Sequence, residues 1–184
     1  MNSLARIASM VFGILMLVLS VAVTIETIVR KLFSISLGGV AELSGYAIAV
    51  GAPLAFAIAA IDRAHIRINI FHMRLGLRTR AVLNALAAVT MAGLAGYLFY
   101  FTWRTVSETA EYQSIAQTPW ATPLIYPQSL WLAVMAIFAV AAIWLGLAAL
   151  RLLAAGDWDG LDRNFAPQSA EEELKAELDD LKRR

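Results

Sequence analysis

The side chains best suited to metal binding or proton transfer near neutral pH are the two histidines, His65 and His72. Both lie in one short polar segment, whereas a bis-histidine haem in a helical bundle needs its ligands on facing helices at membrane depth. The sequence has no cysteine, which excludes a thiol nucleophile, a thiolate metal site and disulfides. It also has no glycine-rich phosphate loop, G-x-S-x-G motif or H-E-x-x-H pair. We therefore predict no catalytic residue, no metal site and no cofactor in this chain.

The charged side chains are few and stand at the ends of long apolar runs. The 184 residues are 60% hydrophobic and 16% charged, against roughly 45–50% apolar and about 25% charged in soluble domains. A net charge of +1 offers no general attraction to nucleic acid. We interpret Glu26 and Glu42 as anchors at the ends of helices rather than as ion ligands. No ionisable residue lies at the centre of an apolar run, so we expect no ion or substrate path through this chain by itself.

Four apolar runs are each long enough to cross a bilayer, since a hydrocarbon core about 30 Å thick takes roughly 20 helical residues. We predict an all-α membrane protein with four transmembrane helices, a short interfacial amphipathic segment and a cytoplasmic C-terminal helix. The predicted spans are residues 7–29, 40–61, 81–103 and 128–150, and they form one membrane domain over residues 1–155. The first run is too long for the apolar region of a signal peptide, so we expect it to be retained.

Residues 156–184 are predicted to be a polar cytoplasmic tail. Residues 156–167 have the composition of a linker. Ser169 and Glu172 then form a capping box that predicts a short helix to the end of the chain. Twelve of the fifteen Lys and Arg residues fall on the side of the membrane that holds both termini in a four-span topology, so both termini are expected to be cytoplasmic.

The connection between the second and third spans carries an arginine stripe beside isoleucine, methionine and leucine residues. If this segment is helical, it would lie in the inner interface with its arginines near anionic head groups. Alternation of Ile66, Ile68 and Ile70 also fits a strand, and simple positive-inside anchoring explains the same charges. The residues predicted to contact lipid head groups or a partner on this inner face are Arg63, His65, Arg67, Arg74 and Arg78.

The connection over residues 104–128 is interrupted by Pro119, Pro123 and Pro127. Such backbone cannot lie bare in hydrocarbon because its amide groups would lack hydrogen-bond partners, so it must sit at the interface or against another protein. An ordinary interfacial loop is the competing interpretation. The residues predicted to contact a partner subunit on this outer face are Trp120, Leu124, Ile125 and Tyr126.

Small residues recur every fourth position in two spans and would let helix backbones approach closely in lipid. Alanine-rich membrane helices also produce such patterns by chance. The predicted packing residues are Ala47, Gly51, Ala55 and Ala59 in the second span, and Ala88, Ala92 and Gly96 in the third.

Three segments together resemble the small membrane subunit of the tripartite ATP-independent periplasmic (TRAP) transporters, called DctQ-like. They are A-E-L-S-G-Y at 41–46, R-A-H-I-R-I-N at 63–69 and T-P-L-I-Y-P-Q at 122–128. The resemblance covers about residues 7–150. The H-I-R-V-D pattern of the family has an amide here, Asn69, in place of its acid, which weakens any charge-pairing role at that position.

The resemblance implies a multi-pass protein of the bacterial inner membrane that supports a large membrane subunit. It further implies that the large subunit holds the substrate and sodium sites, and that a periplasmic binding protein delivers the substrate, typically an organic acid. The small subunit would then be a scaffold that also helps the binding protein to dock. Two alternatives are a membrane-anchor subunit of a respiratory haem enzyme and a lipid-binding or assembly protein that acts alone.

Overall fold

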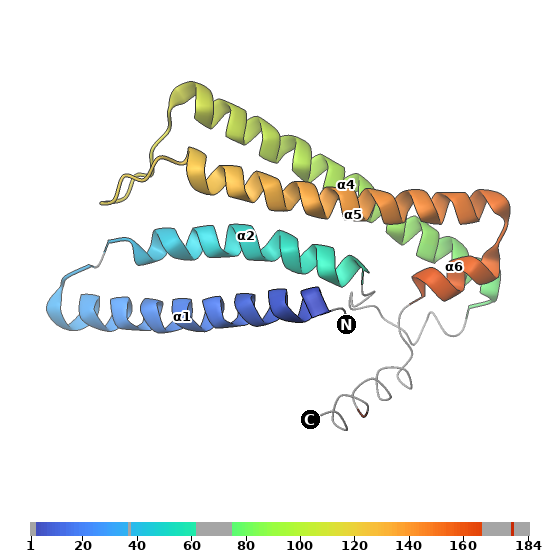
Figure 1. The fold of residues 1–184 in the computed structure, drawn as a ribbon, viewed down its shortest axis with the longest axis horizontal. Helices are drawn as coiled ribbons and strands as arrows, with labels where there is room; N and C mark the ends of the chain where they lie inside the picture. Colours follow the sequence, from blue (N-terminus) through green and yellow to red (C-terminus); the bar gives the residue numbers. More distant parts are fainter. Residues whose placement is uncertain (1–2, 37, 62–74, 167–177, 179–184) are drawn as a thin grey trace. The chain divides into compact units, whose positions relative to one another are not determined.

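The computed structural model describes residues 3–36, 38–61, 75–166 and 178. Helices account for most of these residues, and the only strand-like pairing within them is an isolated bridge between Ile115 and Pro123. The helices are α1 (Ser3–Phe33), α2 (Val40–Ile61), α4 (Leu77–Tyr112), α5 (Ile125–Ala155) and α6 (Trp158–Phe165), as labelled in Figure 1. The prediction of an all-α fold is confirmed.

Four of the helices in the described part of the chain, α1, α2, α4 and α5, are long and apolar enough to cross a membrane. This confirms the predicted number of spans. The second predicted span coincides with α2, but the other three helices extend past their predicted limits. The largest extension is in α4, which continues to Tyr112 instead of ending near residue 103. Its 36 residues reach about 54 Å at a rise of about 1.5 Å each, well beyond a hydrocarbon core of about 30 Å.

The chain divides into two compact units, and α2, α4 and α5 contribute to both of them. The first unit holds Met1–Ile58 and Ala95–Val140, and α1 and α2 form a helical hairpin within it (Figure 1). Gly51 of α2 lies against the ring of Phe12, at a position where a Cβ atom would overlap the ring. The rings of Phe56 and Phe138 are 5.9 Å apart between centroids. Only 6% of the apolar window of α1 is buried, so its side chains are available to lipid or to another protein.

The second unit holds Ala59–Leu94 and Ala141–Arg184, and its core is built largely from alanines. Gly146 of α5 lies so close to α4 that an added Cβ would be 2.7 Å from the Cβ of Ala92 and 3.3 Å from the carbonyl oxygen of Ala88. Small residues therefore bring these helix segments together, as close packing in lipid requires. The buried members of this core are Ala81, Ala85, Ala88, Ala149, Leu161 and Phe165.

The prediction of a linker over residues 156–167 is wrong, because these residues include helix α6. Gly156 ends α5 with φ +68°, a conformation that glycine adopts without strain. The Asp157 side chain then accepts a hydrogen bond of 2.8 Å from the Gly160 N–H and caps α6. Leu161 is fully buried and Phe165 nearly so, which fixes the helix in the second unit. The predicted interfacial segment lies outside the described residues except for its last part, which forms the start of α4. The capping box at 169–172 lies wholly outside the described residues.

Candidate docking surface

The loop over residues 113–124, called here the proline loop, connects α4 to α5. The end of α4 is fixed by Gln113, whose side-chain amide donates a hydrogen bond of 2.7 Å to the carbonyl of Ala110. The Ala116 N–H donates to the carbonyl of Thr122 at 2.9 Å, and the Leu124 N–H donates to that of Ser114 at 3.0 Å. These bonds join the two ends of the loop, so its backbone folds back on itself instead of running as a single extended segment.

The carboxylate of Glu42, in the first turn of α2, holds the middle of the proline loop. Its Oε1 accepts a hydrogen bond of 2.6 Å from the Tyr46 hydroxyl, and its Oε2 accepts one from the Thr118 hydroxyl. Thr122 supplies a further side-chain hydrogen bond to Glu42. The residue is only 7% exposed. We call these four residues, Glu42, Tyr46, Thr118 and Thr122, the Glu42 cluster.

Two glycines before α2 make room for the loop. Gly38 has φ +77°, and a Cβ atom there would lie 3.2 Å from Cγ of Pro119. At Gly39 an added Cβ would overlap the six-membered ring of Trp120. The indole therefore lies against the backbone where α2 begins, and no larger residue fits at Gly39 without moving it.

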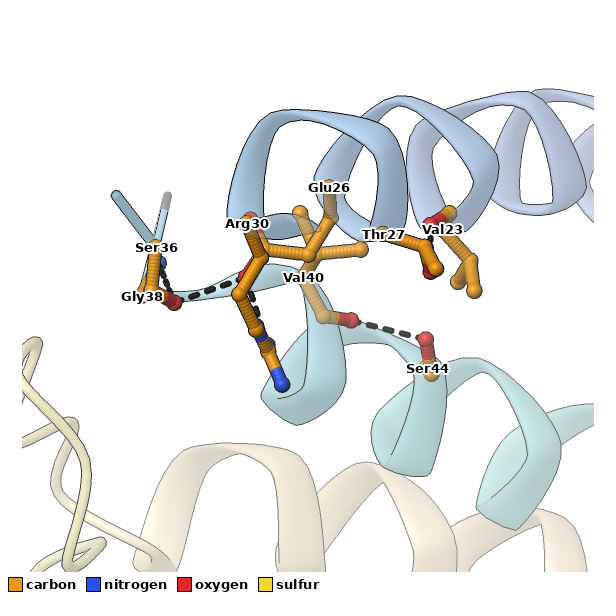
Figure 2. Close-up of polar contacts among 8 residues, drawn as sticks. All are labelled: Val23, Glu26, Thr27, Arg30, Ser36, Gly38, Val40 and Ser44. Carbon is orange, nitrogen blue, oxygen red and sulfur yellow. Dashed lines mark hydrogen bonds and ion pairs between the residues drawn. The ribbon is translucent and has the colours of Figure 1, made fainter. Parts of the chain in front are cut away.

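A second buried carboxylate, that of Glu26, organises the turn from α1 to α2. Figure 2 shows the side chains of Arg30 and Ser36 beside it, and both donate to its Oε1, at 2.6 and 2.7 Å respectively. The Ser36 hydroxyl also accepts a hydrogen bond of 3.2 Å from the Gly38 N–H. Glu26 thus fixes the turn whose glycines receive Pro119 and Trp120. Glu42 lies in the first turn of α2, as predicted for a residue at a helix end, whereas Glu26 lies about two turns before the end of α1; both are buried within hydrogen-bonded clusters.

The residues predicted to contact a partner on the outer face lie on or next to the proline loop. Trp120 is 54% exposed and Tyr126, in the first turn of α5, is 73% exposed, whereas Leu124 and Ile125 are half-buried. Large aromatic side chains on a fixed backbone lose little conformational freedom on binding, which suits a contact surface. We call Trp120, Leu124, Ile125 and Tyr126 the loop surface.

The predicted packing residues are distributed unevenly. In α2, Gly51 is buried against Phe12, Ala47 and Ala59 are half-buried, and Ala55 is exposed. In α4, Ala88 is buried, while Ala92 and Gly96 are half-buried. Sequence reasoning missed Gly146, the partner of Ala88 and Ala92, although it continues a series of small residues on α5 in which Ala142 and Ala149 are also buried.

Of the residues predicted to contact lipid or a partner on the inner face, only Arg78 lies within the described residues, and it is exposed in the first turn of α4. Arg63, His65, Arg67 and Arg74 lie outside them. Arg80 instead forms a salt bridge with Asp162 of α6, in which its Nε donates to Oδ1 at 2.8 Å and its Nη2 donates to Oδ2. Sequence reasoning missed this pair because its members are 82 residues apart.

No group of three or more His, Cys, Asp or Glu residues that could hold a metal ion occurs in the part of the chain that the structure describes. The buried carboxylates have hydroxyl and guanidinium partners instead, as groups that fix backbone segments do.

The chain matches one family model, described as "Tripartite ATP-independent periplasmic transporters, DctQ component", over residues 19–153. The matched region is more than half of the chain and includes the Glu42 cluster and the loop surface. A comparison with curated proteins gave no match.

Proposed function

The chain belongs to the DctQ family of tripartite ATP-independent periplasmic transporters, and from this premise we propose that it is the scaffold of a sodium-coupled carrier for an organic acid. The family assignment selects a small transporter subunit over the respiratory-anchor and stand-alone alternatives. The family works with a large membrane subunit and a periplasmic binding protein, so partners of these kinds are expected. The substrate, sodium coupling and inner-membrane orientation with cytoplasmic termini are part of the proposal.

One observation carries the scaffold role. The described parts of the four apolar helices hold their buried carboxylates near the helix ends, at Glu26 and Glu42, where they fix the backbone. Ionisable groups within the spans mark ion and proton paths in many membrane transporters. Because the buried carboxylates of this chain stabilise its own backbone, the chain fits the role of a scaffold for a partner that carries the transport site.

We further propose that the loop surface receives the periplasmic binding protein, while the apolar sides of the helices serve the large subunit. The support for this division is that Trp120 and Tyr126 remain exposed although the loop that carries Trp120 is held by the Glu42 cluster. Exposed aromatic residues on a fixed backbone are common anchors of protein interfaces.

Joint replacement of Trp120, Leu124, Ile125 and Tyr126 by serine tests this division. We expect the four-residue variant to keep the large subunit during purification in mild detergent and to lose association with the binding protein. The matched control replaces Tyr112 and Ile115, which are 74% and 56% exposed but outside the loop surface. Unchanged association of the binding protein would refute its docking here, and loss of the large subunit would show instead that the loop surface is part of the subunit interface.

A further inference from the structure

Two sequence segments that are far apart in the chain meet at the Glu42 cluster. Residues 41–46 supply Glu42 and Tyr46, and residues 122–128 begin with Thr122. The Thr118 hydroxyl and the Glu42 carboxylate that accepts its hydrogen bond are 76 residues apart in sequence. The buried Glu42 carboxylate thus lies at the start of α2, where the helix dipole also favours negative charge.

Apolar burial does little to hold the proline loop. Of its three large apolar side chains, Ile115 and Trp120 are 56% and 54% exposed and Leu124 is half-buried. The isolated bridge between Ile115 and Pro123 joins the loop to itself, not to α2. The side-chain hydrogen bonds to Glu42 and the contacts of Pro119 and Trp120 with the glycines are therefore what attach the loop to the start of α2.

We propose that Glu42 is a positioning residue that holds the proline loop in a single conformation, so that the binding protein meets a loop surface that is already ordered. Ordering a loop before binding removes a cost that association would otherwise carry. The inference rests on the proposed function, since it assigns Glu42 a role in docking at the loop surface.

This chain has no native cysteine, so one introduced cysteine gives it a single label when the chain is labelled before assembly with the other subunits. Gln117, exposed in the loop, is replaced by cysteine and carries a nitroxide, and the assembled transporter is placed in lipid nanodiscs. Glu42→Gln weakens the cluster from the α2 side, and Thr118→Val removes the donor from the loop side. Tyr46→Phe removes the contact with Glu42 within α2 and a side-chain contact with Thr122 but leaves the Thr118 hydrogen bond in place, and Glu111→Gln is the matched control at an exposed carboxylate.

We expect Glu42→Gln and Thr118→Val to increase the population of mobile label by about tenfold or more, as the loss of a hydrogen bond to a charged group implies. Tyr46→Phe is expected to have a smaller effect, and Glu111→Gln none. Titration of the periplasmic binding protein onto the same nanodiscs should show weaker binding for the two variants that release the loop, with the large subunit still present.

Unchanged label mobility in both Glu42→Gln and Thr118→Val would overturn the positioning role. Increased mobility with unchanged binding of the binding protein would overturn the link to docking, and would locate the failure in the proposed function of the loop surface rather than in the attachment of the loop. Because Thr118→Val leaves α2 intact, it keeps the test valid if Glu42→Gln does not assemble.

Discussion

The attachment of α6 to the second unit leads to a prediction about Leu161→Ala. Leu161 is fully buried, and its neighbours in the core include Ala81, Ala85 and Ala149. The alanine side chains among these neighbours cannot move to fill the space left by the removed isopropyl group. We therefore expect a cost toward the upper part of the range of about 2–5 kcal/mol that is typical of buried leucine truncation.

This cost falls on α6 itself. A helix of eight residues is not stable in water without tertiary contacts. When weaker packing releases α6 from the second unit, the helix therefore unfolds at the same time. A loss of about 2–5 kcal/mol raises the released population by roughly 30-fold to several thousand-fold. The remaining salt bridge between Arg80 and Asp162 is partly exposed, at 29% and 19%, and cannot compensate for such a loss.

Limited trypsin digestion followed by mass measurement reports the release, because Arg163 lies inside α6 and becomes a substrate only when the helix opens. Leu161→Ala should be cut after Arg163 much faster than the unmodified chain. Leu147→Ala is the control, since Leu147 is 48% exposed on α5 and truncating it leaves no cavity. Equal cleavage rates for Leu161→Ala and the unmodified chain, or equal acceleration by Leu147→Ala, would refute the packing argument.

Two other predictions concern the packing of Gly146 and the salt bridge between Arg80 and Asp162. Gly146→Ala should lower the thermal midpoint in detergent. Overpacking against Ala88 and Ala92 costs about 1–3 kcal/mol and exceeds the gain of about 1 kcal/mol from a better helix former. Gly96→Ala is the control, because there is open space where its Cβ would lie, and it should not lower the thermal midpoint. Arg80→Asp or Asp162→Arg should each speed tryptic release of α6, and the double variant should restore protection because it reverses the salt bridge. A double variant as labile as the singles would contradict a specific pairing.

The transmembrane helices could be predicted from the sequence because their apolar runs match the thickness of a bilayer. Their ends could not, because hydropathy does not determine them. The α4 helix continues through the exposed salt bridge of Arg104 and Glu108, in which Nη2 lies 3.0 Å from Oε1. It ends where Gln113 adopts φ +51°. Local hydrogen bonds and backbone conformation set that boundary.

Helix α6 was missed although the sequence contains a signal for it. Trp158, Leu161 and Phe165 have the spacing of one apolar helix face, and Asp157 is a good N-terminal cap. Glycine and aspartate in the same segment are typical of a linker, and only burial against α4 and α5 favours the helix.

The candidate docking surface, like the helices, could be predicted only in part from the sequence. The exposed aromatic residues could be predicted from the local composition of residues 119–126. The buried partners of Glu42 could not, since contacts over 76 residues of sequence depend on how the helices are arranged. Composition indicated that Glu42 anchors a helix end, and the structure adds that it also binds the proline loop.

The intact mass of the assembly isolated in mild detergent tests the central claim most directly. If this 20.0 kDa chain is a transporter scaffold, it should be recovered in a fixed ratio with a larger multi-span membrane subunit. Recovery of the chain only by itself or with copies of itself, under conditions that preserve other membrane complexes, would contradict the account.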